Sequence, residues 1–542
     1  MDFEQTKPTS KSNVFLPIIL SLVLIIGIWL GYFLTIKFSG NVKSGQQQQA
    51  SGNQKINSLL DYIEYQYVDT INKSVLVEKT VTSMLESLDP HSSYIPASDF
   101  EVANESLEGN FDGIGVEFNI IKDTIRVINP IEGGPSEKIG IKAGDKLIKV
   151  EGKAMTGPKI TNKEVFNTLR GKSGTTVNVT VLRNGITSPL NFKIIRDAIP
   201  IYSLDASYMI NANVGYIKIS KFAATTYDEY LKAFNQLSKQ GMKKLVLDLR
   251  GNPGGYLNAA VDISDEFLSN GLQIVYTQGK SNPKKVYKAT ERGSFEKNDL
   301  AILIDEGSAS ASEIVAGAIQ DNDRGLIIGR RSFGKGLVQD QLQLPDGSAV
   351  RLTIARYYTP TGRCIQKPYS DDKSDYYNEE YDRYQHGELF NKDSIKLDKS
   401  KQYKTPEGKV VYGGGGIMPD IFVPIDTNKT NSVLNKIFYS GAINTFAFEY
   451  ADNNRAALKK YGTAQNYINT FEITTPILNE FYAYCEKQNL KLGNFKKEIV
   501  NPLLSPYLKA FIGRDLFDKD AYYPIINKND KCIITATEAL LK

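Results

Sequence analysis

Between residues 199 and 360, short apolar runs alternate with segments whose apolar residues recur every three or four positions. The runs VGYIKIS, KLVLDLR, LAILID and GLIIG are typical of buried strands, and the segments between them are typical of helices. This alternation predicts a layered α/β core. The expected helices cover residues 225–240, 257–268 and 312–320, and two further strands cover 337–342 and 349–357.

The segments on either side of this core have a different character. Residues 55–107 carry helical patterns, and residues 108–198 hold short β-prone runs, Gly-containing turns and one helix near 162–170. A polar stretch rich in Tyr, Asp and Lys follows the core, and the last part of the chain is mostly helical in pattern. The predicted organisation is a tail and membrane segment at 1–38, a tether at 39–54, a helical segment at 55–107, a β-rich module at 108–198, the α/β core at 199–369, a polar excursion with a returning strand at 370–430, and a helical C-terminal region at 431–542.

The N-terminal segment has the features of a membrane anchor. No charged residue occurs between Lys11 and Lys37, a gap of 25 residues. As a helix this gap would span about 37 Å, more than the ~30 Å hydrocarbon core of a bilayer. The apolar run is too long for the core of a cleaved signal peptide, and no small-residue cleavage site follows it. We therefore expect residues 14–36 to form an uncleaved signal anchor, followed by a Gly/Ser/Gln-rich tether.

The orientation of this anchor is less well determined, because lysines occur on both sides of it. The short N-terminal tail favours a cytoplasmic N-terminus. We therefore expect a single-pass protein of the cell (inner) membrane with its catalytic body on the extracytoplasmic, periplasmic side.

Composition excludes several classes of function. A net charge of +4 over 542 residues gives no basis for nucleic-acid binding. The chain has two histidines, His91 and His386, and neither an HExxH nor a CxxC pattern, so we expect no metal and no other cofactor. Cys364, Cys485 and Cys532 are too few for a disulfide framework, and whether any pair forms stays open.

The segment IDEGSASASEI, residues 304–314, places serines at a turn between a strand and a helix. Ser310 would lie at the mouth of the sheet, beside the free N–H groups and the positive end of the helix. Those groups stabilise an oxyanion formed near a nucleophile. The alternative is an ordinary helix cap, with Ser310 or Ser312 as the capping residue and Glu313 or Glu306 nearby.

The segment LVLDLRGNPGG, residues 245–255, runs from a strand into a glycine-rich turn. Glycines let backbone N–H groups approach a ligand closely. An amide of Gly254 or Gly255 could join the amide of Ala311 in an oxyanion hole. The alternative is an ordinary turn between a strand and a helix.

Lys335 stands between two glycines in RSFGKGLVQ, and Gln339 follows four residues later. In an extended strand these two side chains face the same way, so Gln339 can orient the Lys335 amine. The two histidines are poor candidates for a general base, because His386 lies in the polar excursion and His91 follows Asp-Pro at a helix end. Lys335 can serve as the base once burial lowers its pKa from about 10.4. The alternative is a solvated surface lysine.

Several motifs in this order resemble the C-terminal processing peptidases, also called tail-specific proteases: LDPHSSY, LDLRGNPGG, GSASASEIVAGAIQD, SFGKGLVQ and VVYGGGGIMPDI. The resemblance covers residues 55–425. It implies a serine endopeptidase in which Ser310 is the nucleophile, Lys335 the general base and Gln339 the residue that orients the base. It also implies that Gly255 and Ala311 supply the oxyanion hole. This sequence has Gly251 where the family often has Asn or Asp.

The same resemblance implies that the β-rich module is a PDZ domain inserted into a crotonase-like α/β protease core. Its segment Gly113, Ile114, Gly115 and Val116 would hold the terminal carboxylate of a substrate protein, whose tail would lie as an added strand. Arg170 resembles a position that couples tail docking to the active site, with an exposed helix-end arginine as the alternative. Protein tails are thus the expected partners, beside the membrane.

Three other functions compete with this one. A crotonase-type acyl-transfer enzyme would use the same oxyanion geometry but would need no PDZ domain. A catalytically silent PDZ scaffold would not need Ser310 or Lys335, and a trypsin-like PDZ protease is disfavoured by the scarcity of histidines. The last ~110 residues have no assigned role, and they would suit a dimer contact in a homo-oligomer or a wall that tethers substrate.

Overall fold

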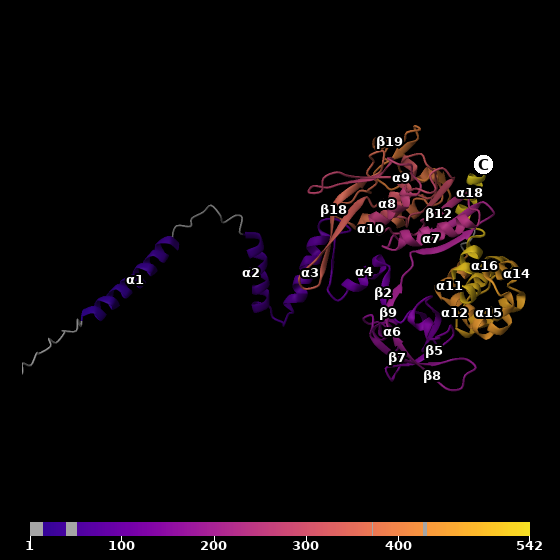
Figure 1. Ribbon diagram of the computed structural model, residues 1–542, viewed down its shortest axis with the longest axis horizontal. Helices are drawn as coiled ribbons and strands as arrows, with labels where there is room; N and C mark the ends of the chain where they lie inside the picture. Colours follow the sequence, from indigo (N-terminus) through magenta and orange to yellow (C-terminus); the bar gives the residue numbers. More distant parts are fainter. Residues whose placement is uncertain (1–14, 40–50, 371, 427–430) are drawn as a thin grey trace, which may run out of the picture. The chain divides into compact units, whose positions relative to one another are not determined.

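The computed structural model describes residues 15–39, 51–370, 372–426 and 431–542 (Figure 1). The chain forms two compact units, residues 1–81 and 82–542. The first unit contains α1 (Phe15–Ser39), α2 (Ser51–Gln66) and most of α3 (Lys73–Glu86). α2 begins inside the segment predicted as a tether, and residues 40–50 of that segment lie outside the described residues.

No helix in the described part of the chain is both long enough and apolar enough to cross a membrane. The signal anchor expected at 14–36 therefore stays a prediction, and residue 14 itself lies outside the described residues.

A six-stranded sheet forms the centre of the second unit, in the order β10-β11-β12-β15-β16-β21. β10 runs antiparallel to β11, and the other neighbours are parallel. The parallel strands are buried on both faces, which explains why their sequences are continuous apolar runs. The bounds are β10 Leu204–Met209, β11 Val214–Ile219, β12 Lys244–Asp248, β15 Leu300–Ile304, β16 Leu326–Gly329 and β21 Ile421–Phe422.

Helices cover both faces of this sheet. α7 (Thr226–Lys239), α8 (Leu257–Asp265) and α9 (Ala311–Asp321) pack on one face, and all three confirm helices expected from the sequence. α18 (Lys531–Leu541), at the end of the chain, packs on the other face through Ile533 and Leu540. The core is therefore a three-layer α/β structure whose second helical layer comes from the C-terminus.

A second sheet lies beside the central one and joins segments far apart in the sequence. β17 (Leu337–Gln343) and β18 (Ala349–Tyr358) correspond to the two further strands predicted from the sequence, and they pair as an antiparallel hairpin. β18 also pairs with β1 (Ser93–Ile95) and with β13 (Gln273–Gln278). Because β1 precedes the β-rich module and β18 follows it, the module is an insertion within the fold of the core.

The β-rich module has its own apolar core and a sheet of order β3-β4-β5-β7-β8, with β6 pairing β5. The predicted helix is present as α6 (Asn162–Leu169). β2 (Asn110–Gly113) and β9 (Asp197–Pro200) pair to form the two-stranded connection to the rest of the chain. The remaining bounds are β3 Val116–Ile121, β4 Thr124–Pro130, α5 Pro135–Lys138, β5 Lys146–Val150, β6 Lys153–Ala154, β7 Thr176–Leu182 and β8 Leu190–Ile195.

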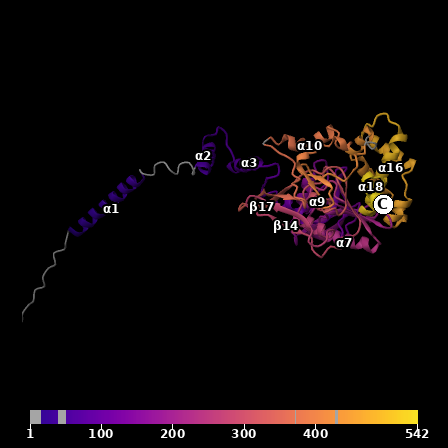
Figure 2. The ribbon, with the colours of Figure 1, turned by 90° about the horizontal axis from the view of Figure 1, so that it is seen from above.

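The polar excursion carries α10 (Ser374–Gln385) and a small hairpin of β19 (Gln402–Lys404) and β20 (Val410–Tyr412). The C-terminal region is helical, as predicted (Figures 1 and 2). Most of its helices surround one apolar cluster of their own. Its helices are α11 Ser432–Tyr439, α12 Ala442–Asn453, α13 Arg455–Leu458, α14 Ala464–Thr470, α15 Thr475–Lys487, α16 Lys497–Phe517, α17 Lys519–Asn527 and α18. α4 spans Phe100–Glu108, just before β2, and β14 (Lys285–Lys288) pairs with β13 in the second sheet.

Candidate active site

Ser310 lies on a sharp turn between β15 and α9. Its φ of 54° and ψ of −111° fall in a region that residues with side chains rarely adopt, at a cost of roughly 1–3 kcal/mol. The surrounding turn is held to the preceding loop, because Ala309 N and Ser312 Oγ both donate to Asn252 O at 2.9 Å. The strained turn sets Ser310 at the N-terminus of α9, as expected from the sequence.

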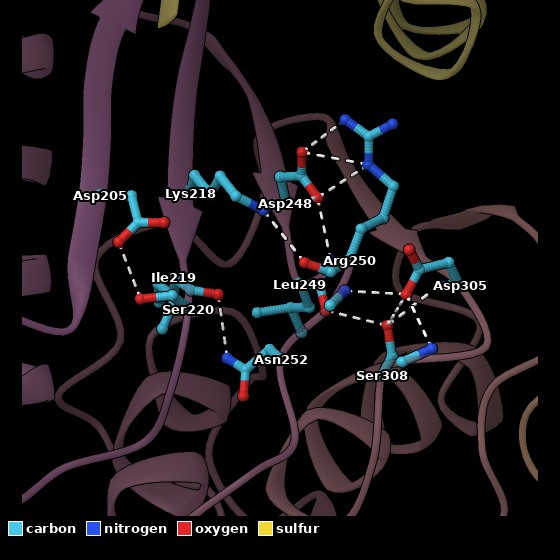
Figure 3. Close-up of polar contacts among 12 residues, drawn as sticks. Asp205, Lys218, Ile219, Ser220, Asp248, Leu249, Arg250, Asn252, Asp305 and Ser308 are labelled. Carbon is cyan, nitrogen blue, oxygen red and sulfur yellow. Dashed lines mark hydrogen bonds and ion pairs between the residues drawn. The ribbon is translucent and has the colours of Figure 1, made fainter. Parts of the chain in front are cut away.

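The glycine-rich loop after β12 is anchored to both neighbouring strands (Figure 3). Asn252 Nδ2 donates to Ile219 O at 2.9 Å, at the end of β11. Ser308 Oγ donates to Leu249 O at 2.8 Å, from the turn that follows β15. These bonds fix the loop at the carboxyl end of the parallel strands, where α/β sheets commonly bind ligands.

Close approach of this loop to Ser310 requires glycine. At Gly254, where φ is +99°, a Cβ would lie 2.8 Å from Ser310 Cβ and 2.9 Å from Ala311 N. At Gly255, where φ is +147°, a Cβ would lie 2.0 Å from Phe222 O. No side chain fits at either position.

The sequence predicted an oxyanion hole formed by the amide of Ala311 and the amide of Gly254 or Gly255. Gly254 N donates to Asn252 Oδ1 at 2.8 Å, so the choice left open between Gly254 and Gly255 favours Gly255. Within the described ranges, neither Gly255 N nor Ala311 N donates a hydrogen bond. Ala311 is the first residue of α9, where backbone N–H groups have no partner inside the helix.

Lys335 is partly buried, and burial lowers the pKa of its amine, with a further contribution from the positive charge of Arg351. Its Nζ donates to Gln339 Oε1 at 3.1 Å. Gln339 Nε2 in turn donates to His91 O at 2.6 Å, which fixes the orientation of the amide. The hydrogen bond expected between Lys335 and Gln339 is thus present.

Lys335 and Gln339 do not lie in one extended strand, although their hydrogen bond was predicted from the sequence in that way. Lys335 lies before β17 begins at Leu337, and the pairing with β18 shifts register between Val338 and Gln339. The two side chains therefore meet across the start of β17 and a register shift within it, and the simple alternation of an extended strand does not apply.

Ser310 and Lys335 line one cavity of about 720 Å³, together with Gly254, Gly255 and Gln339. Across the residues that the structure describes, Lys335 Nζ bonds to Gln339 and no hydrogen bond joins it to Ser310 Oγ. Passage of a proton from Ser310 to Lys335 thus needs a side-chain rotation or one bridging water.

Glu313 was considered in the sequence only as part of a helix cap, and the structure gives it a larger role. Its carboxylate is fully buried and accepts four hydrogen bonds. Oε2 accepts from Ser310 N at 2.9 Å and from Lys335 N at 2.8 Å. Oε1 accepts from Ser332 Oγ and Gly334 N at 2.5 and 2.7 Å. One carboxylate thus joins the turn carrying Ser310 to the loop carrying Lys335, and burial raises its pKa.

Tyr357 makes a second connection between the same two segments. Its hydroxyl donates to Lys335 O at 2.7 Å, with a longer contact of 3.1 Å to Ser310 O. Tyr357 is buried in β18. The sequence contained one signal for Glu313, its place three residues after Ser310 in the same motif, and none for Tyr357.

The segment LDPHSSY holds Gln339 in place from outside the core. Asp89 accepts hydrogen bonds from His91 N, Ser92 Oγ and Thr353 Oγ1 at 2.8, 2.5 and 3.1 Å. This turn presents His91 O to Gln339. Burial and the charge of Lys335 lower the pKa of His91 to about 4, so its ring is neutral at ordinary pH.

The two histidines and the cysteines take no part in the cavity around Ser310. His91 Nε2 contacts Tyr376 Oη at 2.6 Å, and His386 Nδ1 contacts Asp382 O at 2.8 Å in the excursion. All three cysteines are free thiols in the structure, Cys364 partly buried and Cys485 and Cys532 buried. Among the described residues, no group of three His, Cys, Asp or Glu side chains could hold a metal ion.

The segment from Gly113 to Val116 connects β2 to β3. Ile114 is buried, and its carbonyl accepts from Ser136 Oγ at 2.5 Å. Gly115 has a φ of +70°, and its carbonyl accepts from Ile131 N at 3.0 Å. The carbonyls of this segment are thus bonded within the module, and the segment leads directly into β3.

Arg170 directly follows α6, and its guanidinium contacts both an aromatic ring and a carboxylate. Its guanidinium lies 4.7 Å from the centre of the Phe111 ring and donates to both carboxylate oxygens of Glu105 in α4, at 2.8 and 2.6 Å. The neighbour of Glu105, Asn104, accepts from Gln341 Nε2 of β17 at 3.2 Å. A continuous path of contacts therefore leads from α6 to the strand that carries Gln339.

Comparison with known proteins places this geometry in a family. Residues 213–372 match the model of peptidase family S41, and residues 113–194 match that of the PDZ domain. The carboxy-terminal-processing protease of Bartonella bacilliformis is 36% identical over 345 residues, covering 63% of this chain and 78% of that protein. The chain belongs to the carboxy-terminal processing proteases. The resemblance drawn from the motifs is confirmed, and with it a serine protease with a PDZ domain.

Two other similar proteins also cover between three fifths and seven tenths of this chain. CtpA of Bacillus subtilis, a carboxy-terminal processing protease, is 35% identical over 339 residues, covering 62% of this chain and 72% of that protein. The solved photosystem II D1 C-terminal processing protease is 26% identical and covers 69% of this chain and 88% of that one, at a TM-score of 0.36, too low to support an argument. Residues 433–518 match a family of unknown function.

Proposed function

We propose that this protein is an endopeptidase that captures substrate proteins by their C-terminal tails and cleaves them with Ser310 as nucleophile and Lys335 as general base. One observation carries the proposal: Ser310 on its strained turn, Gly255 and a lysine of lowered pKa line one cavity, and Ala311 follows Ser310 directly as the first residue of α9. That combination suits attack on a peptide carbonyl and stabilisation of the resulting oxyanion.

In this mechanism, neutral Lys335 accepts the hydroxyl proton as Ser310 Oγ attacks the scissile carbonyl carbon. Gly255 N and Ala311 N donate to the oxyanion. Protonated Lys335 then gives its proton to the leaving amine as the C–N bond breaks, which leaves an ester on Ser310. Water, deprotonated by Lys335, hydrolyses that ester. Gln339 is a positioning residue, because it holds the Lys335 amine through a hydrogen bond.

Tail capture is assigned to the PDZ domain. The N–H groups of Gly113, Ile114, Gly115 and Val116 would hold the terminal carboxylate, and the tail would pair with β3. The contacts of Arg170 with α4, and of α4 with β17, are a physical route by which tail docking can bias the position of Gln339.

The architecture proposed for the protease is a crotonase-like core split by the PDZ insertion. The pairing of β1 with β18 supports it, because these strands lie on opposite sides of the insertion in sequence. The domain bounds proposed from the sequence, 108–198 for the PDZ domain and 199–369 for the core, enclose or overlap the matched ranges.

Membrane attachment and location belong to the proposal as well. The absence of charge between Lys11 and Lys37 supports an N-terminal anchor, and the large apolar side chains of α1 from Ile18 to Leu34 are exposed. The catalytic body would then lie on the periplasmic side of the inner membrane. A homo-oligomer is also proposed, and sedimentation of the full chain in detergent tests it.

The test uses two unstructured reporter proteins that differ only in their last residues, one ending in apolar residues and one in two aspartates. The full chain in detergent is expected to cleave the first and spare the second, and Ser310→Ala is expected to cleave neither. Equal cleavage of both reporters would remove tail capture and keep the protease. Cleavage by Ser310→Ala would overturn the assignment of the nucleophile.

A further inference from the structure

One edge of the PDZ sheet is open along β3. Among the strands of the described residues, β3 pairs with β4 alone, through a two-residue turn in which Lys122 and Asp123 both have positive φ. Ile121 and Thr124 flank this turn, and the next pair along the ladder is Ile120 with Ile125. Because hydrogen-bonded and non-hydrogen-bonded pairs alternate in an antiparallel ladder, the backbone groups of Ile120 point to the open edge.

The helical C-terminal region is attached at the far end of this strand. Lys122 Nζ lies 2.7 Å from Glu449 Oε1 of α12. Phe448, also of α12, packs in a buried cluster with Ile121 and Ile128. A third contact joins Asn184 Nδ2 to Asp452 Oδ2 at 2.8 Å. The ion pair, the apolar cluster and the hydrogen bond hold α12 against the PDZ domain.

A cavity of about 380 Å³ lies where β3 meets these helices. Ile120, Ile121 and Lys122 form its PDZ side, and residues of α12 and at the end of α15 form the other side. The helical side combines an aromatic ring, an amide and an aliphatic side chain, from Tyr484, Gln488 and Leu490. Such a mixed lining suits peptide side chains better than a purely apolar ligand.

The upstream residues of a tail docked on β3 would point toward this cavity. With its carboxylate at the segment before Val116, the tail runs antiparallel to β3, so its earlier residues lie toward Ile121. At about 3.4 Å per residue, the six residues of β3 correspond to a tail of about 20 Å. The residues about five or six positions before the terminus therefore arrive at the cavity.

We propose that the cavity between β3, α12 and α15 is a second subsite, which binds the peptide segment about five or more residues upstream of the substrate terminus. The inference rests on the proposed capture of tails by the PDZ domain. It gives the 433–518 region a role in substrate recognition: the protein measures the length and accessibility of an unfolded tail as well as its last residues. A tail of four or five residues fills only the PDZ edge.

The experiment measures binding of two fluorescent peptides to the full-length Ser310→Ala chain in detergent. A pentapeptide ends in three apolar residues, and a decapeptide carries the same last five residues preceded by a mixed aliphatic and aromatic segment. Gln488→Trp fills the cavity from an exposed position on its rim. Lys487→Trp is the matched control, because Lys487 is an exposed neighbour that does not line the cavity. Thr445→Trp fills the same cavity from α12 and serves as a second variant.

The decapeptide is expected to bind about tenfold more tightly than the pentapeptide, a difference of about 1.4 kcal/mol. Gln488→Trp and Thr445→Trp should remove that gain and leave pentapeptide binding unchanged, while Lys487→Trp keeps both. An equal gain in all variants, or no gain with length, would overturn the subsite and leave PDZ capture standing. Failure of the pentapeptide to bind at all would instead overturn PDZ capture, and the subsite with it.

Discussion

At the scale of single residues, the arrangement around Ser310 depends on groups that never touch the reacting atoms. Glu313 bonds to the backbone of both Ser310 and Lys335, and the Tyr357 hydroxyl contacts the carbonyls of the same two residues. The two segments are thus fixed to each other through their main chains. The Ser310 and Lys335 side chains keep the freedom that proton transfer requires.

Proteolysis is expected to rise with pH. Burial lowers the pKa of Lys335, so its neutral form, which is the base, gains population as pH rises through that lowered value. The kcat/KM for an apolar-tailed reporter should therefore increase and then level off below the ordinary lysine pKa of about 10.4. Lys335→Arg should be inactive at every pH, because arginine keeps its proton. A flat profile from pH 5 to 9 would speak against a lysine base.

Glu313→Gln should lower kcat and leave the fold and tail binding intact. The glutamine amide cannot accept at both of its ends, so the donors at one of the two carboxylate oxygens lose their acceptor. A displacement of about 1 Å between Ser310 and Lys335 corresponds to a loss of roughly 100-fold. Turnover and peptide binding measured on the same preparation separate the two effects, and unchanged kcat would show that the carboxylate does not position the pair.

At the scale of elements, the glycine-rich loop and the α9 turn fit together only because two side chains are absent. Gly254 lies against Ser310 and Ala311, and Gly255 lies against the Phe222 carbonyl. Gly251, in the same loop, has a φ of +67° but open space around it. The first two positions therefore exclude side chains by contact, whereas Gly251 is limited only by its backbone conformation.

These differences predict opposite outcomes for two substitutions. Gly254→Ala should abolish activity, because its Cβ would displace the Ser310 turn. Gly251→Asn should keep activity within about twofold, because Asn tolerates left-handed backbone better than other residues with side chains. Reporter cleavage together with thermal unfolding of both variants checks this. An active Gly254→Ala protein would mean that the loop is not fixed against Ser310 during catalysis.

Features of the fold and the site that rest on neighbouring residues could be predicted from the sequence, whereas features that rest on residues far apart in the sequence could not. The strands of the core, α7, α8 and α9 follow from local periodicity and were predicted. The cluster around Ser310 was also predictable, because its members sit in long local motifs. Three of the four Glu313 bonds reach residues 19 to 22 positions away, and two of those three come from backbone N–H groups, which leave no pattern in side chains. The bulge that brings Gln339 to Lys335 comes from pairing with β18, which periodicity cannot show.

At the scale of the whole molecule, the C-terminal region completes the protease. α18 covers the face of the central sheet opposite α9, and Asp530 binds Arg250 in the motif that leads into the glycine-rich loop, at 3.0 Å. The helices before α18 contact the PDZ domain. This region was left without an assigned role from the sequence, because the contacts just described join residues more than 200 positions apart.

A matched pair of substitutions tests the structural role of α18. Ile533 is buried against the sheet at 4% exposure, and its neighbour Ile534 is 41% exposed. Ile533→Asp should lower the melting temperature by more than about 5 °C, because it buries an unpaired charge. Ile534→Asp should have little effect. Equal melting temperatures for the two variants would show that α18 is dispensable for the core.

The measurement that most directly tests the central claim is the identification of the residue that becomes covalently modified. The full chain is treated with a fluorophosphonate, which labels activated serines, and the adduct is mapped by tandem mass spectrometry. We expect one adduct, on Ser310, formed at neutral pH by the wild type and lost in Lys335→Arg. An adduct on another serine that tracks the loss of proteolysis, or labelling of Ser310 that is unchanged in Lys335→Arg, would contradict it.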